Sequence, residues 1–124
     1  SLQMRVVRHA ATPGWRFSLS LAVIAELAHA RAATQRGLDL GELAKALRLD
    51  QLQLEPVVDQ LIAMDWVARL DEEGVQRHVL LADPATTPAS VLIDQLLLYP
   101  QPGVAAFRAQ ASFDKLLLAD LLPS

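Results

Sequence analysis

Hydrophobic residues recur at helical spacing early in the chain. Phe17, Leu21, Ile24, Leu27 and Ala28 fall on one face of a helix, which predicts an amphipathic helix over residues 17–36. We expect Gly37 to end this helix, because glycine accepts the left-handed conformation just past a helix end.

A second, shorter helix is predicted after Asp39. Asp39 and Glu42 have the spacing of a capping box, in which each side chain accepts from the other residue's backbone amide. The helix should end near Arg48, with an apolar face made of Leu40, Leu43, Ala44 and Leu47.

A third helix follows the turn "RLD". Pro56 lacks an amide hydrogen, which is tolerated in the first turn but costs about 3 kcal/mol deep inside a helix. We therefore place the start near Gln53 rather than after a cap at Asp50. The residues expected to face inward are Leu54, Val57, Val58, Leu61 and Ile62.

The period then changes from helical to alternating. The segments "WVARL" and "VQRHVLL" flank "DEEG", and Gly74 can take the positive φ of a tight hairpin. This pattern predicts a two-stranded β-hairpin, with Arg69 and Arg77 as cross-strand neighbours.

A further helix and a tail complete the prediction. Thr87 is the expected cap and Pro88 the first residue of the helix "ASVLIDQLLLY", which Pro100 and Pro102 should stop. Two short apolar helical stretches follow, around Phe107 and over 116–121. Val91, Leu92, Leu96 and Leu97 are expected to cover the core.

The order of elements predicts a mostly α (α+β) protein. Its expected fold is a winged helix-turn-helix with a two-stranded β-hairpin wing and a C-terminal helical extension. Residues 1–15 are interpreted as a basic, juxtamembrane-like linker and 16–99 as the winged-helix domain. Residues 100–124 are interpreted as an apolar helical tail that packs on the domain or on a second copy.

Composition supports a folded domain with an uneven charge. Of the 124 residues, 52% are hydrophobic, which provides a core, and there is no cysteine for disulfides or thiolate chemistry. Residues 1–25 hold Arg5, Arg8 and Arg16 and no acid, whereas the remainder holds 8 basic and 14 acidic residues. No stretch approaches the roughly 20 apolar residues that cross a bilayer.

Catalytic chemistry is not indicated. The three histidines, His9, His29 and His78, lie on different elements without ligand spacing, and Asp71-Glu72-Glu73 lacks the spacing of a calcium loop. The scattered glycines form no phosphate-binding loop. We therefore predict a protein without catalytic, metal-binding or cofactor-binding residues.

DNA binding is the function that this fold most often serves, but the charges oppose it. The exposed face of the third helix offers Gln51, Gln53, Glu55, Asp59 and Gln60, without lysine or arginine, and the wing tip is acidic. Because DNA affinity comes mostly from cations against phosphates, nucleic acid is an unexpected partner.

The N-terminal arginines allow two interpretations. Arg5, Arg8, Trp15 and Arg16 fit a segment next to a membrane, since arginine marks the cytoplasmic boundary and tryptophan favours the interface. They also fit an ordinary solvated linker.

Several segments together resemble a known family. "ATPGWR", "LAVIAELAHAR", "LDLGELAKALRLD" and "LIAMDWVARLDEEGVQRHVLLADPATTPASVLIDQLLL" are similar to the cytoplasmic C-terminal region of YihY/BrkB-type inner-membrane proteins, formerly labelled ribonuclease BN or virulence factor BrkB. The likeness covers Ala11 to Leu98, and "HVLLADPATTP" running into "ASVLIDQLLL" is its most specific part. The region beyond Pro100 matches least.

The resemblance implies a location and partners. About six transmembrane helices precede this region in the family, so the chain would be the tail domain on the cytoplasmic face of a bacterial inner membrane. It thus implies the transmembrane domain of the same protein as a partner. The N-terminal arginines add the anionic membrane surface, and the apolar leucines of the tail add a homodimer as an alternative to packing on their own domain. The expected function is a non-catalytic accessory or interaction domain. A DNA-binding regulator and part of a tRNA-processing ribonuclease are the alternatives, although the ribonuclease label brings no residues that can be carried over.

Overall fold

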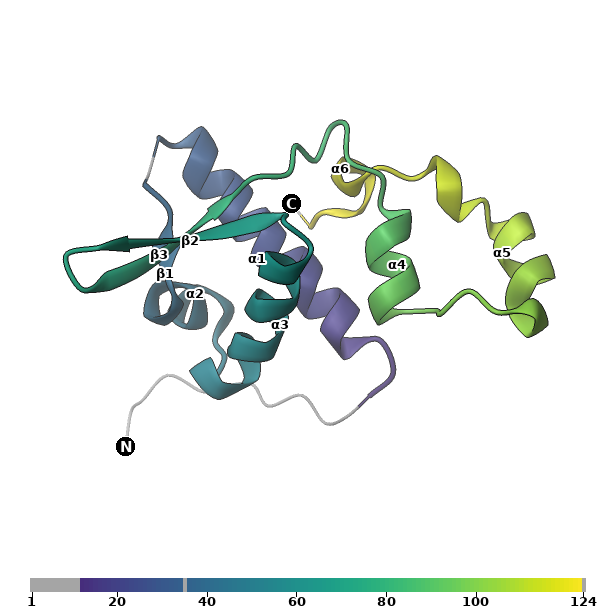
Figure 1. Ribbon diagram of the computed structural model, residues 1–124, viewed down its shortest axis with the longest axis horizontal. Helices are drawn as coiled ribbons and strands as arrows, with labels where there is room; N and C mark the ends of the chain where they lie inside the picture. The colour runs from purple at the N-terminus through teal and green to yellow at the C-terminus, as the bar shows by residue number, and fades with distance from the viewer. Residues whose placement is uncertain (1–11, 35, 124) are drawn as a thin grey trace.

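The computed structural model describes residues 12–34 and 36–123 and has the predicted winged-helix architecture (Figure 1). A helix–turn–helix packs against a longer helix and a small antiparallel sheet, and short helices follow the wing. The elements are α1 (Trp15–Ala32), β1 (Leu38–Asp39), α2 (Leu40–Leu47), α3 (Gln51–Ala63), β2 (Val67–Glu72), β3 (Val75–Leu80), α4 (Ser90–Leu96), η1 (Pro102–Val104), α5 (Ala105–Ala111), η2 (Phe113–Lys115) and α6 (Leu118–Leu121).

The predicted hairpin is confirmed, and the sheet holds a third strand that was not predicted. β2 pairs with β3 from Val67↔Leu80 to Glu72↔Val75, and the turn between them uses positive φ at Glu73 and Gly74. β1 joins the other side of β3, giving the order β1-β3-β2. β1 was not predictable, because two residues are too few to produce an alternating pattern.

Gly37 serves a different purpose from the one predicted. α1 ends at Ala32, and Thr34 already takes a left-handed φ of 60°. Gly37 has φ 92°, and a Cβ at this position would lie 2.5 Å from the carbonyl oxygen of His78. Glycine is therefore required by the close approach of the chain to β3 rather than by the end of the helix.

The predicted start of the third helix is wrong. α3 begins at Gln51 with Asp50 as its N-cap, and the Asp50 carboxylate accepts from the Leu52 amide at 2.9 Å. Pro56 thus lies inside the helix, where it cannot donate to the Leu52 carbonyl. The cap and the full burial of Leu54 offset that lost bond.

The second helix follows the prediction closely. The Glu42 amide donates to the Asp39 carboxylate at 2.7 Å, and the Asp39 amide donates to the Glu42 carboxylate at 2.9 Å, which completes the capping box. Arg48 closes the helix in the left-handed conformation.

The predicted limits of the helix after the wing are also wrong. The Thr87 hydroxyl donates to the Asp83 carbonyl at 2.7 Å, so it caps no helix, and α4 begins at Ser90. α4 ends at Leu96, because the amides of Leu97 and Leu98 both donate to the Ile93 carbonyl and the helical ladder stops there. α4 therefore ends three residues before Tyr99, the residue at which Pro100 was expected to stop the helix.

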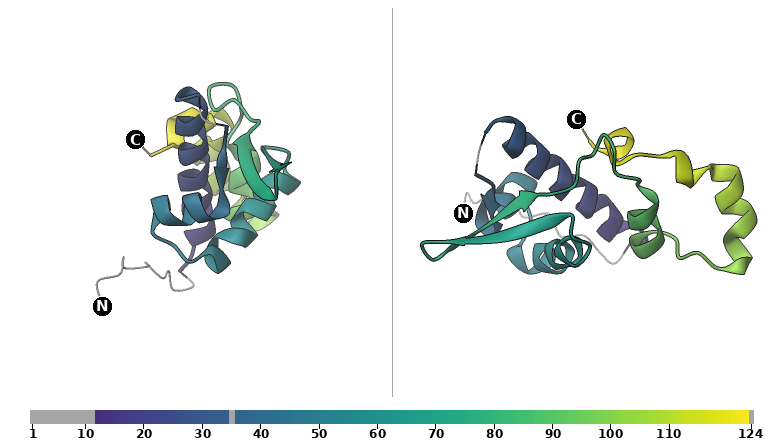
Figure 2. Two further views of the ribbon diagram at one scale, coloured as in Figure 1. Left: turned by 90° about the vertical axis from the view of Figure 1, so that its left-hand side faces the viewer. Right: turned by 45° about the horizontal axis from the view of Figure 1, so that its top comes forward.

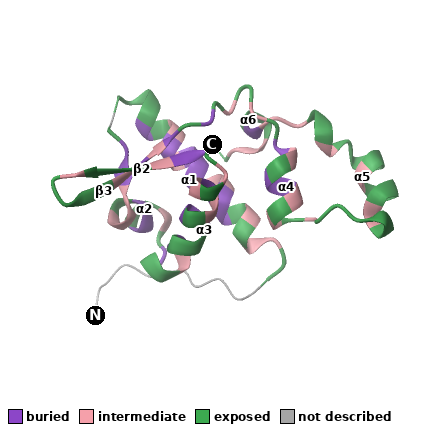
Figure 3. Cartoon of the chain, viewed as in Figure 1, coloured by how far each residue is buried: buried purple, intermediate pink, exposed green. Residues whose placement is uncertain are grey.

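The core lies where α1, α2, α3, the sheet and α4 meet. Its fully buried side chains come from every one of these layers and also from the tail (Figure 3). Leu92 and Ile93 are the α4 residues in it, whereas Val91 and Leu97, predicted to cover the core, are 42% and 47% exposed. The largest buried side chains include Ile24, Leu27, Leu43, Leu54, Leu61, Leu92, Ile93 and Leu118.

The tail leaves the body and returns to it. α5 lies at one end of the molecule and the wing tip at the other, as two orientations show (Figures 1 and 2). Leu118 of α6 is completely buried in the core, with Leu116, Leu121 and Leu122 packed beside it. The leucines at the end of the chain therefore pack against their own domain.

Candidate interaction surface

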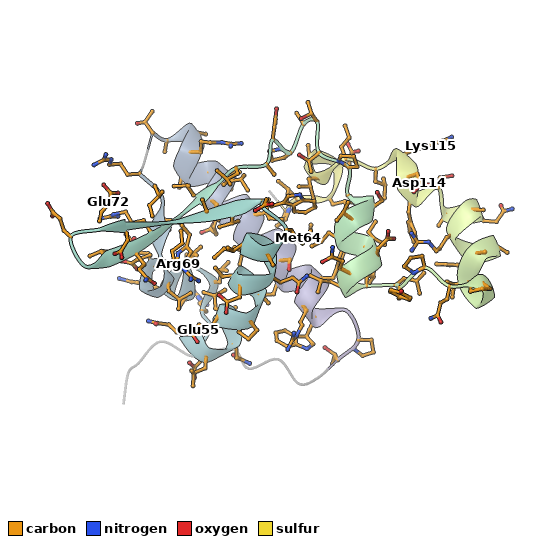
Figure 4. The ribbon with its side chains drawn as sticks, in the orientation of Figure 1. Glu55, Met64, Arg69, Glu72, Asp114 and Lys115 are labelled. Carbon is orange, nitrogen blue, oxygen red and sulfur yellow. The ribbon has the colours of Figure 1, made fainter. Side chains whose placement is uncertain are left out.

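The outward face of α3 is acidic and partly apolar. Opposite the buried residues of the helix, Leu52 is 73% exposed and Glu55 and Asp59 are exposed as well. The wing continues this acidic surface to its tip at 71–73 (Figure 4 labels Glu55 on α3 and Arg69 and Glu72 on the wing). In a winged helix this is the face that approaches DNA.

Arg69 links the wing to α3. Its Nη2 lies 2.9 Å from Asp59 Oδ1, and its Nε donates toward His78 Nε2 at 3.4 Å. Together with Leu40, Glu55, Val58 and Gln76, these three residues line a depression of about 290 Å³ between helix and wing. The guanidinium thus already has an anion beside it within the same molecule.

His78 lies at the base of this depression. It is 3% exposed, and its Nδ1 lies 3.0 Å from the carbonyl oxygen of Leu38. Because a carbonyl oxygen only accepts, Nδ1 carries the proton, and Nε2 is left to accept from Arg69. Burial lowers the pKa of His78 from 6.5; the Arg69 charge acts in the same direction, while the hydrogen bond to Leu38 opposes it.

The other cations beside the wing are also paired with acids. Arg77 Nη1 lies 3.9 Å from Glu42 Oε1 on α2, and Arg36 Nη1 lies 3.6 Å from Glu72 Oε2 on β2. Arg69 and Arg77 are not the cross-strand neighbours that were predicted: Arg69 is opposite His78, and Arg77 is opposite Leu70. With a side-chain period of two, the two arginines point to opposite faces of the sheet.

The structure describes Trp15 and Arg16 among the four residues predicted to lie near a membrane. Arg5 and Arg8 lie outside the described residues. Trp15 begins α1 and packs against the core, and the guanidinium of the exposed Arg16 lies 5.5 Å from its ring centroid. Trp15 also lines a hollow of about 300 Å³ with Leu47 and Leu49.

Sequence reasoning missed the cluster around Arg69. The sequence predicted Arg77 opposite Arg69 and gave His78 no role, whereas the observed register places His78 opposite Arg69. The sequence also did not predict a contact outside this cluster. Arg31 of α1 donates to the carbonyl oxygens of Leu80 and Ala82, at 2.9 and 3.2 Å, and so fixes the end of β3. Within residues 12–34 and 36–123, no three His, Asp or Glu side chains gather as a metal site would require.

Among the helices that the structure describes, none combines the length and the apolar character needed to span a bilayer.

Curated relatives of the chain are membrane proteins. A UPF0761 membrane protein of Methylibium petroleiphilum is 49% identical over 122 residues, which is 98% of this chain and 29% of the relative. One from Verminephrobacter eiseniae is 38% identical over 98% of this chain and 31% of its own length. The chain therefore spans under a third of these relatives. The likeness to these relatives extends past Pro100, into the region where the family resemblance in the sequence is weakest. No family model matches the chain.

Solved structures with the same fold include proteins named as regulators. A putative transcriptional regulator from Listeria innocua has a TM-score of 0.65 at 20% identity, covering 93% of this chain and 88% of that one. The global cysteine regulator CymR of B. subtilis has a TM-score of 0.62 at 19% identity, covering 94% and 96%. IscR from T. potens has a TM-score of 0.63 at 14% identity, covering 93% and 85%. At these identities the likeness concerns the fold alone.

Proposed function

Because the chain is homologous over 98% of its length to the UPF0761 membrane proteins, the YihY/BrkB family, we propose that it is the cytoplasmic accessory domain of a bacterial inner-membrane protein. In this role it makes contacts with other proteins and with the membrane surface, and it carries out no reaction. No relative or structural neighbour reported above is named as an enzyme.

The observation that carries the proposal is that the arginines of the wing and Arg36 beside it are each paired with a carboxylate, including Arg69 on the side of the wing that faces α3. Arg69, Arg77 and Arg36 each lie beside a carboxylate of the same chain. A phosphate approaching any of them would also approach that carboxylate, and like charges repel. Since cation–phosphate contacts supply most DNA affinity, this surface is better suited to a protein partner than to a nucleic acid.

DNA binding is the second candidate, because two of the solved structures reported above with this fold are named as regulators. A fluorescence-anisotropy titration with duplex DNA at low salt separates the two candidates. We expect weak binding that is little altered by Arg69→Ala together with Arg77→Ala. Tight, salt-sensitive binding that this double substitution abolishes would establish DNA reading instead.

A second variant tests the masking directly. Asp59→Asn with Glu42→Gln removes the acids beside Arg69 and Arg77 but keeps the size of the side chains. If pairing masks the arginines, this variant should bind DNA more tightly than the parent and with a steeper salt dependence. The matched control is Asp71→Asn with Glu73→Gln, which removes the same charge from the wing tip.

The cytoplasmic location is testable because the chain has no cysteine. Asp71→Cys would be introduced into the whole membrane protein, in a form that lacks other cysteines, and intact spheroplasts would be treated with a membrane-impermeant maleimide. We expect labelling only after the membrane is permeabilised. Labelling of intact spheroplasts would place the domain on the outer side.

The membrane contact is tested with substitutions, because Trp15 packs into the domain and deleting residues 1–16 would remove the start of α1. Arg5→Gln, Arg8→Gln and Arg16→Gln together should reduce retention of the chain by anionic vesicles, and neutral vesicles should retain neither form. Lys45→Gln with Arg48→Gln removes exposed cations from α2 and should have less effect. An equal loss in both variants would contradict a specific N-terminal contact.

A further inference from the structure

Residues 97–115, called here the C-terminal arm, extend from the body and are fixed to it at both ends. The arm starts where α4 ends, and it finishes where the Ala89 amide donates to the Leu116 carbonyl and the Leu118 amide donates to the Thr87 carbonyl, both at 2.9 Å. Between these anchors, α5 is described in full and has no buried residue (Figure 3).

Arg108 fixes the shape of the arm. It donates to the Leu98 carbonyl at 2.8 Å, forms an ion pair with Asp94 of α4, and lies 5.6 Å from the ring centroid of Phe113. Phe113 in turn meets Phe107 edge to face, with centroids 5.9 Å apart. A seven-residue helix is not stable alone in water, so these contacts hold α5 in place although it is not packed into the core.

The surface of the arm carries exposed aromatic rings, and its charged residues are Arg108 and, at its end, the exposed Asp114 and Lys115. From Leu96 to Phe113 the only charged residue is Arg108, and Asp94 neutralises it. Tyr99 is 71% exposed and Phe107 is 59% exposed. Interface centres are enriched in aromatic residues and depleted of charge, whereas anionic lipid or nucleic acid requires cations. The arm therefore fits an apolar protein surface.

A hollow lies on the same arm, beside the exposed rings. Its volume is about 470 Å³, and its lining combines apolar and polar residues: Pro100, Gln101, Pro102, Ala105, Arg108, Ala109, Phe113 and Asp114. A two-fold interface uses one patch twice, so that patch must carry both the projecting group and the space that receives it. Exposed aromatic rings and a hollow that offers proline, alanine and Phe113 beside Arg108 and Asp114 lie within one arm and meet this requirement.

The exposed rings supply up to about half of the area that a specific dimer needs. A fully buried aromatic side chain removes roughly 150–250 Å² from solvent, so Tyr99 and Phe107, which are 71% and 59% exposed, supply roughly 400–650 Å² from two copies. The surrounding alanines and prolines must supply the rest of the approximately 1,200 Å² that specific dimers bury. We propose that the C-terminal arm is the interface of a symmetric homodimer, in which an exposed ring of each copy fills the hollow of the other.

Sedimentation velocity and light scattering of the 124-residue chain test this proposal. We expect a dimer whose dissociation constant rises about tenfold or more in Phe107→Ser or in Tyr99→Ser. Leu52→Ser, which changes an equally exposed apolar side chain on α3, should leave the dimer intact. Circular dichroism melting of each variant separates loss of dimer from loss of fold.

Disulfide trapping gives a second measurement, since the parent chain has no cysteine. Gln110→Cys on α5 should form a covalent dimer on mild oxidation, and Asp71→Cys at the wing should not. A chain that stays monomeric up to millimolar concentration would overturn the proposal and leave the arm to a different apolar protein. A dimer trapped through the wing, and unaffected by Phe107→Ser, would also overturn it.

Discussion

Arg69 on the wing and Asp59 on α3 are joined by an ion pair of 2.9 Å, so two charges that could each face a partner face one another. The pair also holds the wing against the helix. It explains why the side of the wing that faces α3 presents little free positive charge in a fold shared with regulators. Arg77, on the other face of the sheet, and Arg36 are paired as well.

The Arg69–Asp59 pair should contribute little to stability. The side chains are 39% and 66% exposed, and exposed ion pairs typically contribute about 0.2–1 kcal/mol. A double-mutant cycle with Arg69→Ala and Asp59→Ala, measured by urea unfolding, should give a coupling free energy in this range that decreases as salt is added. A coupling well above it, unaffected by salt, would mean that the pair is structural and that its role in masking charge is secondary.

Gly37→Ala should be strongly destabilising. The new Cβ would lie 2.5 Å from the carbonyl oxygen of His78, and φ is 92°. We expect a loss above about 1 kcal/mol in the free energy of unfolding, because β3 must move to accommodate the methyl group. Gly74→Ala, with φ 81° and open space around it, separates conformational strain from steric clash and should be milder. Gly103→Ala meets no atom within 4 Å and serves as the neutral control; equal losses in all three variants would contradict the close approach at Gly37.

Most helices and the hairpin were predictable from the sequence because their signals are local. The Asp39–Glu42 capping box and Gly74 follow from spacing and backbone preference alone. Gly37 is different, because it is needed where the distant His78 carbonyl passes close by. Thr87 is diverted from capping by a nearer competitor, the Asp83 carbonyl four residues before it.

The candidate surface was only half predictable, because its ion pairs depend on tertiary packing. The acidic residues of α3 and of the wing tip are visible in the sequence, but the partner of each arginine depends on how α2, α3 and the sheet pack. Arg69 meets Asp59 ten positions away, while Arg77 meets Glu42 across 35 positions, and no local pattern encodes either pair.

Leu118→Ala should show that the end of the chain belongs to the folded domain. Leu118 is completely buried among core residues although it follows the exposed α5. Removing a buried leucine costs about 2–5 kcal/mol, through lost transfer free energy and the cavity that remains. Leu52→Ala, on a side chain that is 73% exposed, is the matched control and should change the free energy of unfolding by about 0.5 kcal/mol or less. A small loss for Leu118→Ala would mean that α6 detaches readily from the body.

His78 should make the stability depend on pH. Burial lowers its pKa from 6.5, so protons bind to the unfolded chain before they bind to the folded one. Stability should therefore begin to decrease as the pH falls below about 6.5, and the contribution should level off once the pH is below the folded pKa. Protonation at Nε2 would also place a second donor against Arg69, whose Nε lies 3.4 Å away.

Two measurements check the His78 prediction. In a chain with His9→Gln and His29→Gln, the one remaining imidazole should titrate below 6.5 by NMR, and each unit of difference corresponds to about 1.4 kcal/mol. Urea unfolding from about pH 7.5 to about pH 5 should then show a larger loss of stability in the parent than in His78→Gln. Carboxylates titrate in both proteins, so the difference between the two slopes isolates His78. Parallel slopes, or a midpoint above 6.5, would show that the ring is not held neutral between Leu38 and Arg69.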